Sequence, residues 1–185
     1  HTASNLEDHI AGIRQLAERY PYMDLNRVGI TSGVGGCNAP VYGLLKYPEF
    51  YKVGTACSTY DIRLACASMI ERWQSLPRDQ KSDCEQSLLG TLAANLQGKL
   101  LLVHGMLDHS FHPANVFQLV DALIRENKDF DLLLMPNAGH MWEGYGQRRA
   151  WDYFVRQLLG NEPPTQFKLK HAWAFGVEEN SQRKQ

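Results

Sequence analysis

The chain has 185 residues, 44% of them hydrophobic, which is enough for one sizeable core and short for two full domains. Its 19 Lys and Arg nearly balance its 20 Asp and Glu, so net charge favours neither nucleic acid nor an anionic membrane as a partner. The sequence shows no run of about 18 apolar residues and no signal peptide pattern, and we expect no membrane span.

The first third of the chain predicts alternating helices and strands. Apolar residues recur at three- and four-residue steps from Leu6 to Ala17, which is typical of an amphipathic helix ending near Tyr20. A short strand is predicted at 27–30, followed by a glycine-rich turn. A helix at 38–46 and an apolar strand at 53–57 come next, which gives β-turn-α-β order.

The rest of the chain continues the alternation. Residues 61–97 have mixed periodicity, which indicates an excursion with short helices. The run at 99–104 is continuously apolar, as in strands covered on both faces. A helix beginning near Pro113, a strand at 130–135 and a helix marked by Trp151 and Leu158 complete the series.

This order predicts an α/β fold, with a mostly parallel sheet and helices on both faces. We expect residues 1–164 to form one domain, because Glu162-Pro163-Pro164 ends the packed unit, and residues 165–185 to form a polar tail. Ligand sites in such folds lie beyond the carboxyl ends of the strands. The four cysteines form no Cys-x-x-Cys pair, and the compartment stays undetermined.

The turn at 31–36 resembles the site of a serine nucleophile, but its serine is out of register. A nucleophile on a sharp strand-to-helix bend needs small neighbours, usually as Gly-x-Ser-x-Gly. If Gly35-Gly36 closes that motif, the nucleophile position is Gly33, and Ser32 stands one residue early. A phosphate-binding loop is disfavoured, since no Lys follows the glycines and Gly-x-Gly-x-x-Gly is not matched.

Three strand ends carry residues of a catalytic type. The glycine turn follows the strand at 27–30, Asp108 follows the strand at 99–104, and His140 follows the strand at 130–135. Turn, Asp, His is the chain order of the triad in α/β-hydrolases, where the Asp orients the His that takes the nucleophile's proton. The alternatives are a helix-capping role for Asp108 and an ordinary surface position for His140.

The motifs at these strand ends resemble the C-terminal part of the catalytic domain of the prolyl oligopeptidase family of serine peptidases, especially its dipeptidyl-peptidase-like and bacterial members. The matching pieces, spread over about residues 5–164, are Arg27-Val28-Gly29-Ile30-Thr31, Gly35-Gly36, His104-Gly105-Met106-Leu107-Asp108, Gly139-His140 and Phe154-Val155-Arg156-Gln157-Leu158-Leu159-Gly160. The resemblance implies an α/β-hydrolase fold that lacks its N-terminal strands, and peptide-bond hydrolysis without a cofactor. It gives Asp108 an orienting role and His140 a general acid/base role.

The resemblance also implies a substrate pocket. Glu71-Arg72-Trp73-Gln74-Ser75-Leu76-Pro77 is similar to a family segment whose aromatic residues line the pocket for proline. Trp73 falls on one aromatic position, although it is equally compatible with core packing, and Met69 replaces another. Ser110 stands where the family often has an Asn that positions the substrate. A metal site is not expected, since His104, His109 and His112 do not repeat at helical spacing.

The departures from the family pattern leave the activity open. Ser32 could act only if the turn brings its hydroxyl within about 3 Å of His140; Cys37 and Ser58 are weaker candidates. The alternatives are an inactive hydrolase that serves as a binding or assembly module, and a turn from which one residue has been lost in reading the sequence. An active protein would take a peptide or small acyl substrate. We also expect another segment or chain, for example in an oligomer, to complete the sheet.

Overall fold

The computed structural model describes residues 5–32, 38–59, 89–140, 144–167 and 169. Helices and strands alternate along these residues, in the order α1 (Leu6–Arg19), β1 (Val28–Thr31), α2 (Ala39–Lys46), β2 (Tyr51–Cys57), the 3-10 helix η1 (Leu89–Asn95), β3 (Lys99–Gly105), α5 (Ala114–Arg125), β4 (Asp131–Met135) and α6 (Tyr145–Leu159).

The predicted helices and strands that fall on described residues are all present, with shifted ends. β2 begins at Tyr51 rather than at Val53, and α6 begins at Tyr145, ahead of the predicted Trp151. Of the predicted excursion at 61–97, residues 61–88 lie outside the described part, while 89–95 form η1. Most of the predicted tail also lies outside it.

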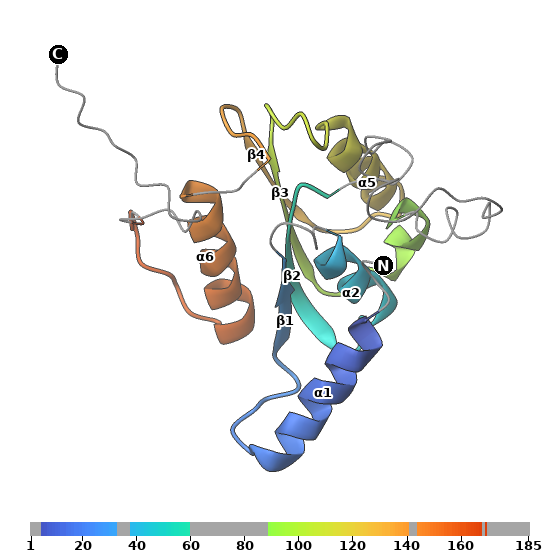
Figure 1. Ribbon diagram of the computed structural model, residues 1–185, viewed down its shortest axis with the longest axis vertical. Coiled ribbons are helices and arrows are strands. Elements are labelled where there is room, and N and C mark those ends of the chain that lie inside the picture. The colour runs from blue at the N-terminus through green and yellow to red at the C-terminus, as the bar shows by residue number, and fades with distance from the viewer. Residues whose placement is uncertain (1–4, 33–37, 60–88, 141–143, 168, 170–185) are drawn as a thin grey trace.

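The four described strands form a parallel sheet in the order β1-β2-β3-β4. Cys57 at the end of β2 pairs with Val103, and Gly105 at the end of β3 pairs with Met135 at the end of β4. The turns that follow these strands therefore meet at one edge of the sheet, as Figure 1 shows for β3 and β4.

Helices cover both faces of the sheet. α6 lies on one face, and α1, α2 and α5 lie on the other (Figure 1). Alternate residues of β3 serve the two layers: Leu100 and Leu102 belong to the core cluster that includes α2 and α5, whereas Leu101 and Val103 pack with α6. This arrangement explains the continuous apolar run, because a strand covered on both faces has no solvent side.

Local sequence accounts for how α6 is placed. Ala150 and Tyr153 are buried against the sheet, and the Tyr153 hydroxyl donates a hydrogen bond of 2.9 Å to Asp131 Oδ2 at the start of β4. The helix ends at Leu159, and its C-cap residue Gly160 has a φ of 67°, a left-handed conformation that glycine adopts without steric cost. None of the helices in the described ranges is long and apolar enough to cross a membrane.

Candidate active site

The turn after β3 fixes the carboxylate of Asp108. Oδ1 accepts hydrogen bonds from the backbone N–H groups of Ser110 and Phe111, each at 2.9 Å, and the Asp108 side chain is fully buried. The helix that follows, α5, has Pro113 as its N-cap residue, and its first backbone N–H, of Ala114, donates to His112 Nδ1 at 3.2 Å. Asp108 therefore shapes its own turn and does not cap α5, in contrast to the alternative raised by the sequence.

The turn after β4 brings His140 to this carboxylate. His140 Nδ1 lies 3.0 Å from Asp108 Oδ2, and the imidazole is 21% exposed while Asp108 is enclosed. An ionised carboxylate only accepts hydrogen bonds, so Nδ1 carries the proton and the lone pair of the neutral ring lies on Nε2. The Phe111 ring, at 5.1 Å between centroids, packs beside the imidazole. The arrangement presents an oriented histidine base at the sheet edge.

Hydrogen bonding keeps Asp108 ionised. Burial by itself would raise its pKa, because a charge is costly in a poorly solvated site. Hydrogen bonds from the Phe111 backbone and from the His140 side chain outweigh burial, and the pKa of Asp108 is lowered. The carboxylate is thus available to stabilise a positive charge on His140.

A second histidine lies beneath this pair. His104, on β3, is fully buried, with Nε2 2.9 Å from the Phe111 carbonyl oxygen and 4.0 Å from Asp108 Oδ2. The carbonyl can only accept, so Nε2 carries the proton. Burial lowers the pKa of His104, and this effect exceeds the opposing influence of Phe111 and Asp108. The sequence places His104 in a family motif and does not favour it as a metal ligand, and it assigns the residue no role.

Ser58 also contacts the acid–base pair, through a hydrogen bond to His140 that the sequence does not predict. It follows β2 directly, it is fully buried, and its hydroxyl donates to the His140 carbonyl oxygen at 3.2 Å. From the sequence, Ser58 is only a weak candidate for the nucleophile. Its position one residue beyond an apolar strand next to β3 was the available signal, but spacing does not reveal where a hydroxyl points.

The predicted nucleophile makes no hydrogen bond to His140. Ser32, after β1, is only 9% exposed, and its Oγ atom has no hydrogen-bond partner among the atoms of the described structure. Thr31, the residue before it, is held to β2 by a 2.8 Å hydrogen bond from Thr55. Gly33 and Cys37 lie outside the described residues. The sheet edge therefore carries an assembled acid–base pair and a separate, buried serine.

The structure contains one of the three predicted substrate-binding residues. Ser110 lies in the Asp108 turn, where its backbone N–H binds the carboxylate. Met69 and Trp73 fall outside the described residues. Within the part that is described, no group of three or more His, Cys, Asp or Glu side chains is placed to hold a metal ion.

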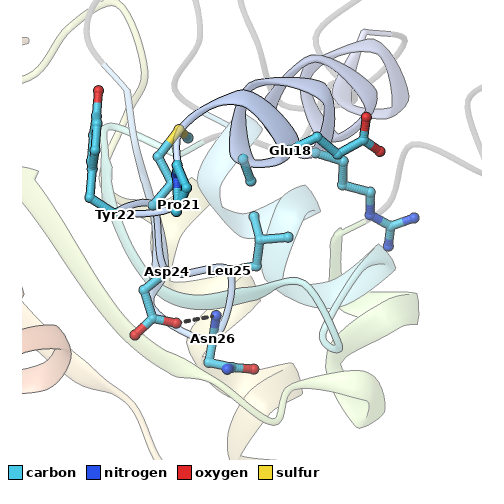
Figure 2. A pocket seen from close by; sticks show the side chains of 9 residues that line it. Glu18, Pro21, Tyr22, Asp24, Leu25 and Asn26 are labelled. Atoms are coloured by element: carbon cyan, nitrogen blue, oxygen red, sulfur yellow. Dashed lines mark hydrogen bonds between the residues drawn. The ribbon is translucent and has the colours of Figure 1, made fainter.

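A surface pocket lies at the opposite edge of the sheet. It is lined by the end of α1 and by the loop leading into β1, including Glu18, Tyr22 and Leu25 (Figure 2). Asp24 in this loop accepts a hydrogen bond from the Asn26 backbone and forms an ion pair with Arg27 at 2.7 Å. Its carboxylate is therefore neutralised by a residue of the same loop. Because this loop precedes β1, while Asp108 and His140 follow β3 and β4, the pocket is remote from the acid–base pair.

Comparisons with known proteins agree with this geometry. The human (Homo sapiens) dipeptidyl peptidase 8 is 29% identical over 142 residues, which cover 73% of this chain and 16% of that protein. The inactive dipeptidyl peptidase 10 of Rattus norvegicus is 30% identical over 138 residues, which cover 72% of this chain and 17% of that protein. The solved structure of Porphyromonas gingivalis dipeptidyl peptidase 4 matches with a TM-score of 0.71 and 26% identity, covering 84% of this chain and 22% of that one.

The chain thus spans about a sixth of the length of these curated relatives. Its parallel sheet and covering helices are those of the α/β-hydrolase fold. The sequence model of the prolyl oligopeptidase family matches residues 2–160, most of the chain. This chain therefore belongs to the prolyl oligopeptidase family.

Proposed function

We propose that this domain is a serine-peptidase-type hydrolase, acting on peptide or small acyl substrates, whose altered nucleophile turn impairs its activity. The observation that carries the proposal is the 3.0 Å bond between His140 Nδ1 and Asp108 Oδ2, which leaves Nε2 free to act as a base. In this reaction Nε2 takes the proton of a nucleophilic hydroxyl and returns it to the leaving group, while Asp108 stabilises the imidazolium.

The nucleophile in this proposal is Ser32. It follows β1, two strands from β3 in the same parallel sheet, so it stands at the catalytic edge. Its buried Oγ has no hydrogen bond in the described structure, and a change of the turn is needed to bring it to His140. Because the turn has to change before Ser32 can react, we expect acyl transfer to be slow. We further propose that Met69 and Trp73 line the pocket and that Ser110 helps to position the substrate.

The second candidate is an inactive hydrolase that serves as a binding or assembly module. It is favoured by the same Ser32 hydroxyl, which is hydrogen-bonded to no base in the described structure, and by the glycine at position 33, which has no side chain to attack a carbonyl. One of the relatives is named an inactive dipeptidyl peptidase. In this case Asp108 and His140 would persist as a structural pair.

We also propose that a further segment or a second chain pairs with β1. In the described structure β1 bonds to β2 on one side only, and Val28, Gly29 and Ile30 are partly exposed. Backbone groups along such an edge favour addition of another strand.

Labelling with a fluorophosphonate probe, with the modified residue located by mass spectrometry, tests these functions. The full chain, Ser32→Ala and Gly33→Ser are compared, with Asp108→Asn as the control for the acid–base pair. Replacement of the orienting Asp by Asn lowers catalysis by about 10⁴-fold in serine proteases, so labelling that needs the pair should fall steeply in Asp108→Asn.

The outcomes separate the two candidates. Labelling of the unmodified chain that disappears in Ser32→Ala supports the hydrolase. Labelling only in Gly33→Ser, at the substituted position, supports an inactive protein that retains a working acid–base pair. No labelling of any variant would contradict the hydrolase and favour the binding module. The intact mass of the chain also decides whether the turn holds one residue more than the sequence states.

A further inference from the structure

Ser58 lies where three strand ends converge. It follows β2, and its backbone N–H donates to the carbonyl oxygen of Val103 on β3 at 3.0 Å. Its side chain reaches the turn after β4, where Oγ lies 3.2 Å from the carbonyl oxygen of His140. One residue therefore joins β2, β3 and the histidine turn.

The backbone of Ser58 is in an unfavourable conformation that aims the side chain. Its φ is 48°, in the left-handed region that residues other than glycine rarely occupy. Strain of this kind persists only where the surroundings impose it, and it concentrates at functional sites. Because the residue is fully buried, the hydroxyl contacts only protein groups around it.

The hydroxyl is bonded to the backbone of His140. A carbonyl oxygen only accepts, so the Ser58 hydroxyl is the donor to His140. The neighbouring Cys57 thiol lies 4.0 Å from the His140 carbonyl, which makes it a much weaker substitute.

Few other described contacts hold the histidine turn. The Leu107 N–H donates to the Ala138 carbonyl oxygen at 2.9 Å, which fixes the start of the turn two residues before His140. Ser58 holds the backbone of His140 itself. Loss of its hydroxyl would leave the imidazole positioned mainly by its own bond to Asp108.

We propose that Ser58 is a positioning residue, whose hydroxyl ties the His140 turn to the end of β2 and so keeps the imidazole against Asp108. This inference rests on the proposed role of Asp108 and His140 as the acid–base pair. It requires no particular nucleophile.

Proton NMR of the full chain tests the proposal directly. The proton on His140 Nδ1, bonded to a carboxylate, gives a signal far downfield that is assigned by its loss in Asp108→Asn. The Nε2 proton of His104, bonded to the Phe111 carbonyl, gives a second buried signal that reports on the integrity of the fold. The measurement is the rate at which each proton exchanges with solvent.

In Ser58→Ala, we expect exchange of the His140 proton to be about fivefold faster, the factor that corresponds to the loss of one typical hydrogen bond. The His104 signal should be unchanged. Ser58→Gly relieves the positive φ and should give the same result, which keeps the test valid if the alanine variant folds poorly. Thr59→Val is the matched control, because the Thr59 hydroxyl is buried without a hydrogen-bond partner in the described structure.

The proposal would be overturned by unchanged exchange of the His140 proton in both Ser58 variants, by normal exchange in Ser58→Gly alone, or by equal acceleration in Thr59→Val. Loss of the His104 signal together with that of His140 would also overturn it, because the effect would then be general loosening. Failure of probe labelling leaves these NMR results standing, so failure of the proposed function is distinguishable from failure of this inference.

Discussion

At the scale of single residues, the two ring nitrogens of His104 have different surroundings. Nε2 donates to the Phe111 carbonyl oxygen at 2.9 Å, which holds the turn that carries Asp108. Nδ1 is buried and has no hydrogen-bond partner among the described atoms. A proton on Nδ1 would therefore create a charge without a direct acceptor. Burial lowers the pKa of His104 for this reason, and the folded protein holds the neutral ring.

We predict that acidification destabilises the fold through His104. An unfolded histidine binds a proton near pH 6.5, whereas the lowered pKa of His104 keeps the folded ring neutral at that pH. The stability contributed by the neutral ring is fully present above about pH 6.5 and is lost as pH falls through the folded pKa. The loss is at most about 1.4 kcal/mol for each pH unit.

The variant His104→Gln isolates this contribution, because its amide nitrogen can still donate to Phe111 but does not titrate. Urea unfolding of both proteins between about pH 5 and pH 7.5 should show a flatter dependence on pH for the variant. The other six histidines are common to both proteins. Equal slopes would show that His104 does not couple folding to protonation.

At the scale of elements, the turns after β3 and β4 are in direct backbone contact. Met106 N–H donates to the Met135 carbonyl oxygen at 2.9 Å, which continues the strand pairing beyond Gly105. A Cβ atom at Gly105 would collide with the carbonyl oxygens of Ala138 and Gly139. Glycine at position 105 is therefore what allows the Asp108 and His140 turns to approach each other.

We predict that Gly105→Ala destabilises the protein by about 1–3 kcal/mol, the usual cost of forcing an extra methyl group into a packed site. The colliding atoms belong to the backbone and cannot move aside as a side chain would. Gly139→Ala is the control from the same contact, because a Cβ at position 139 meets no atom within 4 Å. Denaturant unfolding measures both; similar stability of the two variants would contradict the argument.

At the scale of the whole molecule, the described sheet has two edge strands, β1 and β4, and β1 is the one on which the prediction rests. β2 and β3 are each bonded on both sides, whereas β1 has a described neighbour only in β2. α6 packs on β1 from one face, but a helix on the face of a sheet does not satisfy the backbone groups along a strand edge.

We predict that the chain, prepared alone, self-associates through β1. Gel filtration with light scattering should give a mass above the 21.0 kDa of one chain, and hydrogen exchange at residues 28–31 should slow as concentration rises. A folded monomer at all concentrations, with unprotected β1 amides, would contradict pairing at this edge. A segment or protein that pairs with the β1 edge should abolish the self-association.

The sequence determined the order of elements in the described residues and the fold class. Patterns such as the apolar run of β3 are local, so they predict the parallel sheet without reference to any tertiary contact. The placement of Asp108 and His140 after β3 and β4 followed as well, since parallel strands bring their carboxyl ends to one edge.

Only the tertiary structure decided which side chains meet at that edge. The 3.0 Å bond between Asp108 and His140 joins residues 32 positions apart in the sequence. The hydrogen bond from the Ser58 hydroxyl to His140 joins residues 82 positions apart. The Ser32 hydroxyl, at the same edge, forms no hydrogen bond in the described part of the chain. These outcomes depend on backbone dihedrals in turns, such as the positive φ of Ser58, and on packing by distant elements. Hydrophobic periodicity carries no information about either.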